Sequence, residues 1–110
     1  MKPVVVVNPK LLSIITFGFA CGITLWPFII VKEKNEGIIR HERIHIKQQA
    51  EMLVIFFYLW YGIEYLIHFT RYKKFEVSYS NISFEKEAYS NEKNPEYINN
   101  RKMYSWTKYL

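Results

Sequence analysis

The chain has 110 residues, of which 50% are hydrophobic and 18% aromatic, and its formal net charge is +5. This composition predicts one folded domain over residues 1–110 and excludes a disordered tail, which needs low hydrophobicity and high charge. A single cysteine, Cys21, excludes a disulfide framework and a cysteine-based zinc finger. Any metal site must therefore use histidine and carboxylate, and we expect Cys21 to be a small buried hydrophobic residue.

The basic residues are spread along the chain and accompany no nucleic-acid-binding motif, so we predict no nucleic-acid partner. Excess positive charge permits contact with anionic lipid headgroups. Association with a membrane therefore remains an alternative to a fully solvated surface. Either a membrane-associated or a cytoplasmic bacterial protein fits this balance.

The N-terminal third is the most apolar part of the chain. Residues 1–10 hold two prolines and four consecutive valines, a pattern typical of a short strand or an extended arm. Residues 11–31 carry no charge, which meets the length criterion for a transmembrane helix. Glycines and Pro27 interrupt this run, and residues 24–31 are rich in β-branched and aromatic types. Two interpretations follow: a membrane-inserted segment, or a helix or loop followed by an edge strand at 24–31.

The rest of the chain has mainly helical character. Residues 32–37 predict a polar turn, followed by a helix from about Ile38, and the apolar run 52–69 predicts a second helix that is buried or faces a membrane. Residues 70–83 predict a strand or an irregular segment, and Ser83 is expected to cap a helix that starts at residue 84. A turn and a last short helix should follow at Pro95, and the aromatic C-terminal end should pack back on the core.

Residues 41–45 read His-Glu-Arg-Ile-His, an H-E-x-x-H motif. In a helix His41 and His45 lie on one face, about 6 Å apart, so both imidazoles can bind one Zn²⁺ at about 2.0–2.1 Å. Glu42 lies beside them, where its carboxylate can deprotonate a zinc-bound water. The alternative interpretation is an exposed polar helix face without a metal.

A catalytic zinc with two histidines needs a third protein ligand and an open position for water, and glutamate is the natural choice in this chain. Glu64 follows His45 at a spacing similar to that of the zinc aminopeptidase family. However, residues 46–61 contain no turn residue, and a continuous helix would place Glu64 about 28 Å from His45. Glu64 is otherwise expected to reach toward solvent or to pair with Arg71.

Glu85 is the second candidate for the third ligand. Residues 70–84 can span about 50 Å when extended, so Glu85 can return to the histidines, more easily if the long helix breaks in the fifties. Glu85-x-x-Ala88 resembles the E-x-x-A-D or E-x-x-A-N motif of gluzincin metallopeptidases, as in the HtpX and CAAX-prenyl protease group and the ImmA-like group. The resemblance implies that Glu85 is the third zinc ligand. Tyr89 stands where those families have Asp or Asn, so either its hydroxyl contacts a histidine or that contact is missing.

A second resemblance covers residues 22–49. Small proteins with a HELAHVVQQ-type metal helix place an edge strand and a polar loop before it, and here TLWPFI and KEKNEG precede HERIHIKQQ. In zincins such a strand binds extended substrate by strand addition, which favours a strand at 24–31. The whole chain also resembles a family of small bacterial proteins that share HERIH…QQ, YLWY and ISFE-x-EAY segments.

Other polar and aromatic residues are expected outside the metal site. Glu87 and Glu92 are weaker candidates for the third ligand and are expected instead to face solvent or to pair with lysines, and His68 should face an interface or a partner. The aromatic stripe at 56–61 should be core or lipid contact.

We therefore predict a minimal gluzincin-type metallopeptidase that is mainly α with a short β element. Zinc is held by His41, His45 and Glu85, Glu42 is the general base, and a peptide or protein is the substrate. Candidate donors to the substrate carbonyl are Tyr79, Tyr89 and His68. The alternatives are a purely structural metal site, and a membrane-associated scaffold in which the motif is degenerate.

Overall fold

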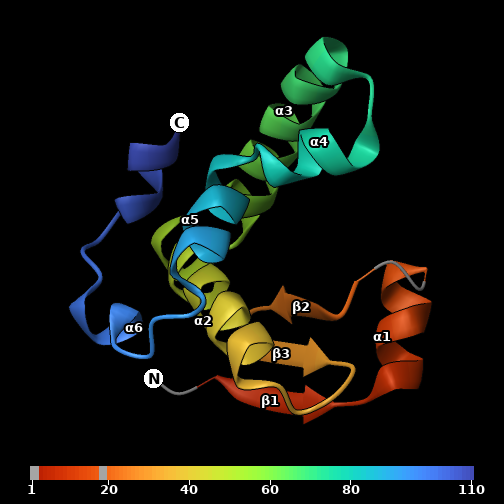
Figure 1. Cartoon of the computed structure of the whole chain (residues 1–110), viewed down its shortest axis with the longest axis vertical. Helices are drawn as coiled ribbons and strands as arrows, with labels where there is room; N and C mark the ends of the chain where they lie inside the picture. Colours follow the sequence, from red (N-terminus) through yellow and green to blue (C-terminus); the bar gives the residue numbers. More distant parts are fainter. Residues whose placement is uncertain (1–2, 18–19) are drawn as a thin grey trace.

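Six α-helices and a three-stranded sheet are present in the part of the chain that the computed structural model describes, residues 3–17 and 20–110 (Figure 1). This confirms the predicted fold class, mainly α with a short β element. Residues 1–2 of the expected N-terminal strand and residues 18–19 of the apolar run lie outside the described residues.

The sheet is built from the N-terminal third. Strand β1 (Val4–Val7) pairs in parallel with β3 (Phe28–Val31), and β2 (Gly22–Leu25) pairs with the other side of β3 in antiparallel register, giving the order β1-β3-β2. Helix α1 (Pro9–Thr16) follows β1, and the side chain of Asn8 caps it by accepting from the backbone N–H of Leu11. The valine run forms a strand by pairing with β3, and the strand ends at Val7 because Pro9 begins a helix just after it.

The described residues of the apolar run at 11–31 do not form one continuous helix. It contains most of α1 and the β2–β3 hairpin, which reverses at Trp26 and Pro27. The prediction of a strand is therefore confirmed, but the single strand at 24–31 was wrong, because the chain turns in its middle. Strand β2 lies at an edge of the sheet and β3 at its centre.

Two helices joined at a sharp bend form the centre of the molecule. Helix α2 (Glu36–Glu51) is capped by Asn35, and α3 (Ile55–Tyr72) follows after a break with positive φ angles at Leu53 and Val54. The two axes meet at 111°. A continuous helix is therefore wrong, and a break in the fifties is what the structure has.

No turn residue causes this bend; packing does. Met52, just after α2, lies against a core cluster formed by Phe57, Ile82, Phe84 and Trp106. Positive φ is unfavourable for Leu53 and for the β-branched Val54. The burial of the large side chains of this core cluster must therefore offset the strain at the bend.

The C-terminal half contains three further α-helices. Residues 75–80 form α4 (Phe75–Ser80) and not a strand or an irregular segment, which corrects the prediction for 70–83. Helix α5 (Ser83–Asn91) follows, and Ser83 is its first residue rather than its cap, because its hydroxyl bonds Glu64 and Ile82 occupies the cap position. The short α6 (Tyr97–Asn100) comes next.

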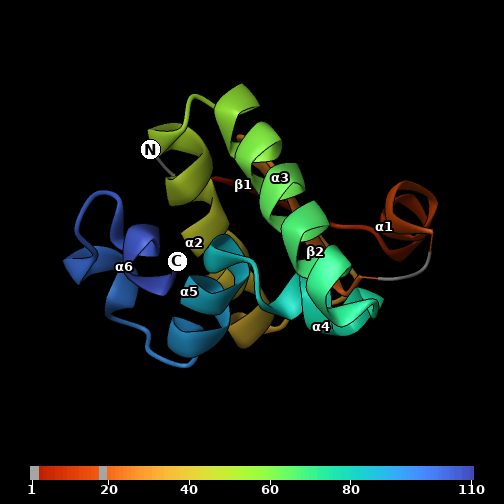
Figure 2. The same ribbon diagram turned by 90° about the horizontal axis from the view of Figure 1, so that it is seen from above.

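The last segment packs back as predicted. A 3-10 helix (Ser105–Tyr109) carries Trp106, which is 5% exposed and packs its ring against Phe84 at a tilt of 58°. In Figures 1 and 2 this segment and α1 lie at opposite ends of the molecule, with α2, α3 and α5 between them.

Among the described residues no single helix is long and apolar enough to cross a membrane. Helices α2 and α3 meet that criterion only when taken together as a bent pair.

Candidate metal centre

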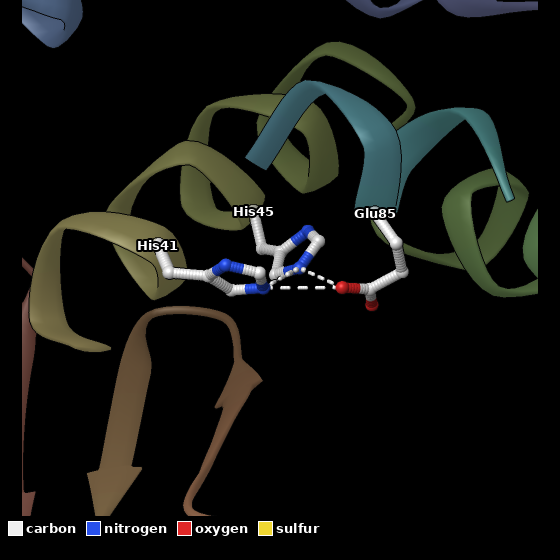
Figure 3. Close-up of side chains that lie close together, drawn as sticks. All are labelled: His41, His45 and Glu85. Atoms are coloured by element: carbon white, nitrogen blue, oxygen red, sulfur yellow. Dashed lines mark hydrogen bonds and ion pairs between the residues drawn. The ribbon is translucent and has the colours of Figure 1, made fainter. Parts of the chain in front are cut away.

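Three side chains from two helices converge at the centre of the fold. His41 and His45 lie one turn apart on α2, and Glu85 projects from the first turn of α5, which packs on α2 (Figure 3). All three are buried, with exposed fractions of 6%, 5% and 3%. The sequence-predicted ligands are therefore brought together, and they form a group that can hold a metal ion.

The three facing atoms are nearly equidistant. Nε2 of His41 and Nε2 of His45 lie 3.1 and 3.2 Å from Oε1 of Glu85, and 3.3 Å from each other. Two imidazole nitrogens and one carboxylate oxygen thus form a small triangle with room for one ion beside it.

The opposite nitrogen of His45 is fixed by an amide. Nδ1 of His45 lies 2.6 Å from Oε1 of Gln48, whose Nε2 donates to Oε1 of Glu87 at 2.9 Å and to the carbonyl of Phe84 at 3.0 Å. Because both of those partners only accept, the amide orientation is determined and its oxygen must face His45. Nδ1 of His45 therefore carries the proton that it donates to Gln48.

His41 is oriented in the same way by a carboxylate. Its Nδ1 lies 2.9 Å from Oε1 of Glu92, which is half-buried at the end of α5. Glu92 is partly exposed and pairs with His41, not with a lysine, so the predicted lysine pairing was wrong. Tyr89 packs its ring edge-on against His41, with centroids 4.5 Å apart, and the polar contact expected at residue 89 comes from Glu92.

Glu85 is held by a hydroxyl on its other oxygen. Tyr61 of α3 donates to Oε2 of Glu85 at 2.8 Å, which leaves Oε1 to the histidines. Burial and the neighbouring Glu85 raise the pKa of Tyr61, so the hydroxyl keeps its proton. Burial alone would raise the pKa of Glu85, but the two histidines outweigh it and hold that pKa well below its usual range.

These contacts give the centre a donor set that could hold a cation. With both Nδ1 protons donated outward, neutral His41 and His45 present lone pairs to each other and to an ionised Glu85. Three acceptors at 3.1–3.3 Å repel one another unless a proton or a metal ion lies among them. Without a metal, burial would lower the pKa of His45, but Glu85 outweighs it and raises that pKa to about 9.

Glu42 lies beside this centre and is fixed by the edge strand. Oγ1 of Thr24 donates to the Glu42 carboxylate at 2.8 Å and approaches its backbone carbonyl at 3.0 Å. The strand comes this close because residue 22 is glycine: a Cβ there would lie 3.0 Å from a methyl of Ile38 and 3.3 Å from Cγ of Glu42. Glu42 is 7% exposed.

Two hollows flank the centre. A cavity of about 420 Å³ reaches His45 and Glu85, and one of about 300 Å³ reaches His41. Glu42 lines both. The other residues common to the two are Ala20, Gly22 and Tyr79. The centre and the Gly22 end of β2 are therefore accessible from two sides.

Cys21 lines the smaller cavity and is exposed, so its predicted burial was wrong.

Glu64 lies outside the triad, as the choice of Glu85 required. It accepts from the backbone N–H of Ser83 at 2.9 Å and from the Ser83 hydroxyl, so it neither reaches toward solvent nor pairs with Arg71. His68 is half-buried and lies 3.8 Å from Glu64. A carboxylate at the first turn of α5 suits the helix dipole and positions the turn that carries Glu85.

Compared with known proteins, the chain matches no family model, no curated protein and no solved structure.

The supporting contacts were largely missed at the sequence level. Glu87 is fully buried and pairs with Arg101, which also donates two hydrogen bonds to the Glu51 carboxylate, at 2.9 and 3.0 Å. The prediction that Glu87 faces solvent or pairs with a lysine was therefore wrong. The position of Gln48, three residues after His45 in a helix, is a signal that could have been used. Nothing local points to Arg101, because its partners are 14 and 50 residues away.

Proposed function

We propose that the protein is a minimal zinc-dependent metallopeptidase of gluzincin type, with zinc held by His41, His45 and Glu85. The observation that carries this is the buried acceptor-only triangle, whose nitrogens and oxygen have their other sides occupied by hydrogen-bond partners. A polar helix face does not need buried acceptors that are oriented in this way, whereas metal ligands are typically oriented by such outer hydrogen bonds.

The spacing suits zinc. Ligands at about 2.0–2.1 Å in tetrahedral geometry lie about 3.3–3.4 Å from one another. The three separations of 3.1, 3.2 and 3.3 Å in the protein are within a few tenths of an ångström of that value. Two imidazoles and one carboxylate form the His₂Glu set typical of catalytic zinc, and a zinc ion held by these three residues would still have a position for water.

Peptide hydrolysis is the chemistry that this arrangement supports best. A bound zinc ion polarises a peptide carbonyl and makes water acidic at neutral pH. Glu42 then accepts the proton of the attacking water on its carboxylate and transfers it to the leaving amine. Thr24 orients the Glu42 carboxylate by donating a hydrogen bond to it. Because Glu42 is buried, its carboxylate does not form competing hydrogen bonds to bulk water.

The edge strand beside the centre supports an extended peptide as the substrate. Lys32 donates to the carbonyl of Cys21, so the alternation of the strand turns the backbone groups of Gly22 and Thr24 away from β3. The Thr24 carbonyl is already bonded by Gln49 and Tyr58. Pairing with a peptide would therefore use the Gly22 end, where both cavities meet.

The test is hydrolysis of a peptide mixture by the zinc-loaded chain, read by mass spectrometry of the products. Glu42→Gln is the decisive variant, because the amide still accepts from Thr24 but cannot take a proton. We expect it to keep zinc and to lose at least a hundredfold in rate. A zinc-loaded protein that cleaves nothing, or that cleaves equally well as Glu42→Gln, would contradict the proposal and indicate a structural metal.

A further inference from the structure

Helix α3 turns a large apolar surface outward. Apart from buried Phe57 and Glu64, most of its side chains are accessible, and the seven apolar residues of one side are 38–70% exposed. We call these residues the outer face of α3: Ile55, Phe56, Leu59, Trp60, Ile63, Leu66 and Ile67. Contiguous apolar exposure on this scale marks a surface that binds something.

The width of the outer face argues for a partner with a broad, flat surface. At 100° per residue, its members span an arc of about 140°, and Phe57 and Glu64 fall on the opposite side of the helix. A partner helix needs only the narrow seam of a coiled coil. An arc this wide, along a helix about 27 Å long, suits a helix lying flat in a lipid interface.

Aromatic residues border the outer face. Trp60 lies at one edge of the arc, and Tyr58 and Phe69 lie just beyond the other edge, each 38–43% exposed. The rings of Trp60 and Tyr58, each with an apolar body and a polar tip, favour the boundary between acyl chains and headgroups.

The charge around the outer face is complementary to an anionic surface. Arg71, Lys73 and Lys74 are exposed at the C-terminal end of α3. The only acid within α3 is Glu64, and its carboxylate is buried against Ser83; the nearest exposed acid is Glu76, two residues after Lys74. A second copy of the chain would offer this cluster no opposite charge from its own α3, whereas acidic lipids supply it.

We propose that α3 docks on anionic membranes, with its outer face immersed at the level of the headgroups and its axis parallel to the bilayer. The docking surface is distinct from the metal centre and does not depend on catalysis. The wall of the larger cavity that α3 supplies, at Tyr58, Tyr61, Gly62 and Tyr65, is next to the outer face around the helix, so docking places the cavity mouth beside the headgroups.

Flotation of the full chain with vesicles tests this. Wild-type protein should float with vesicles of phosphatidylglycerol and phosphatidylcholine, and far less with phosphatidylcholine alone. Leu59→Gln combined with Leu66→Gln should lower binding at least tenfold, because both side chains are more than half exposed and contribute little to the fold. The matched control is Met103→Gln with Leu110→Gln, also exposed and apolar but at the C-terminal end.

A charge variant separates the lipid headgroup from apolar adsorption. Replacing Arg71, Lys73 and Lys74 by Gln should lower binding to anionic vesicles by about a hundredfold, whereas the same change at Lys93, Lys102 and Lys108 should have a much smaller effect. Circular dichroism checks that each variant is folded. Failure of the wild type to float, or equal binding by the α3 variants and their controls, would overturn the proposal. So would a dimer that the Leu59/Leu66 change dissociates in the absence of lipid binding.

Discussion

Oε1 of Glu92 lies 2.9 Å from Nδ1 of His41, so the end of α5 determines which nitrogen of that histidine faces Glu85. Residues 85 and 92 are seven apart in the sequence, about two helical turns, and so share a face of α5. One short helix thus supplies both a candidate ligand and the carboxylate that orients another candidate ligand. The resemblance to E-x-x-A-D motifs placed this contact one turn earlier, at Tyr89.

Loss of the Glu92 carboxylate should weaken metal binding without preventing it. In Glu92→Ala, His41 loses the acceptor that fixes its tautomer, and zinc affinity should fall tenfold to a hundredfold. Glu92→Gln keeps an acceptor oxygen and should restore part of it. Competition with a chromogenic chelator measures both, and Glu96→Ala, at an exposed site, is the control. Equal affinities in Glu92→Ala and wild type would contradict the assigned role.

Arg101 should be the most sensitive position for stability outside the apolar core. Its side chain is 3% exposed, and its guanidinium joins Glu51 of α2 to Glu87 of α5, so Arg101→Met leaves two carboxylates without their cation. The free energy of unfolding in urea should fall by about 3–5 kcal/mol. Lys102→Met, at the exposed neighbouring position, should change it by less than about 0.5 kcal/mol. Similar losses in the two variants would refute this.

The stability of the metal-free protein should fall between neutral and alkaline pH. Glu85 raises the pKa of buried His45 from 6.5 to about 9, despite burial, so the protonated form stabilises the fold below pH 6.5 and this contribution is lost as the pH rises through 9. The full loss is about 3 kcal/mol. Urea unfolding at pH 6 and pH 9.5 measures it.

Two controls isolate His45 as the source of this pH dependence. Zinc replaces the proton at the centre, so the loaded protein should not lose stability in this way. Glu85→Gln removes the charge that raises the pKa of His45 and should abolish the dependence as well. A metal-free protein that becomes more stable toward pH 9.5 would contradict the assigned charge state.

Thr24 should affect turnover and not metal content. Thr24→Val removes the hydroxyl that holds the Glu42 carboxylate, and the peptide hydrolysis that we propose should then fall tenfold to a hundredfold. Thr24→Ser keeps the hydroxyl and should recover most of the rate. If Thr24→Val and wild type hydrolyse peptides at the same rate, the edge strand does not orient Glu42.

The local parts of the site could be predicted from the sequence, because helical spacing alone places His41, His45 and Gln48 on one face. The helical part of the fold class follows from composition and periodicity, whereas the preference for a strand at 24–31 rested on what the resemblance implies. Asn8 and Asn35 each cap a helix as such residues do, so helix starts are also readable.

What could not be predicted depends on contacts between distant segments. The bend at Leu53 and Val54 has no turn residue and exists because Trp106 and Phe84 pack into a common core with Phe57. Ser83 has the composition of a cap, but a buried Glu64 from another helix takes its hydroxyl. Local propensity is a weak guide wherever such tertiary contacts decide.

Zinc content per chain tests the central claim most directly. We predict one zinc per wild-type chain by elemental analysis, none in His41→Ala or His45→Ala, and a much weakened site in Glu85→Ala. A matched control, His68→Ala, should retain the full zinc equivalent, since this side chain lies outside the triad. A wild-type protein that binds no zinc, or full zinc retained in either triad histidine variant, would contradict the account.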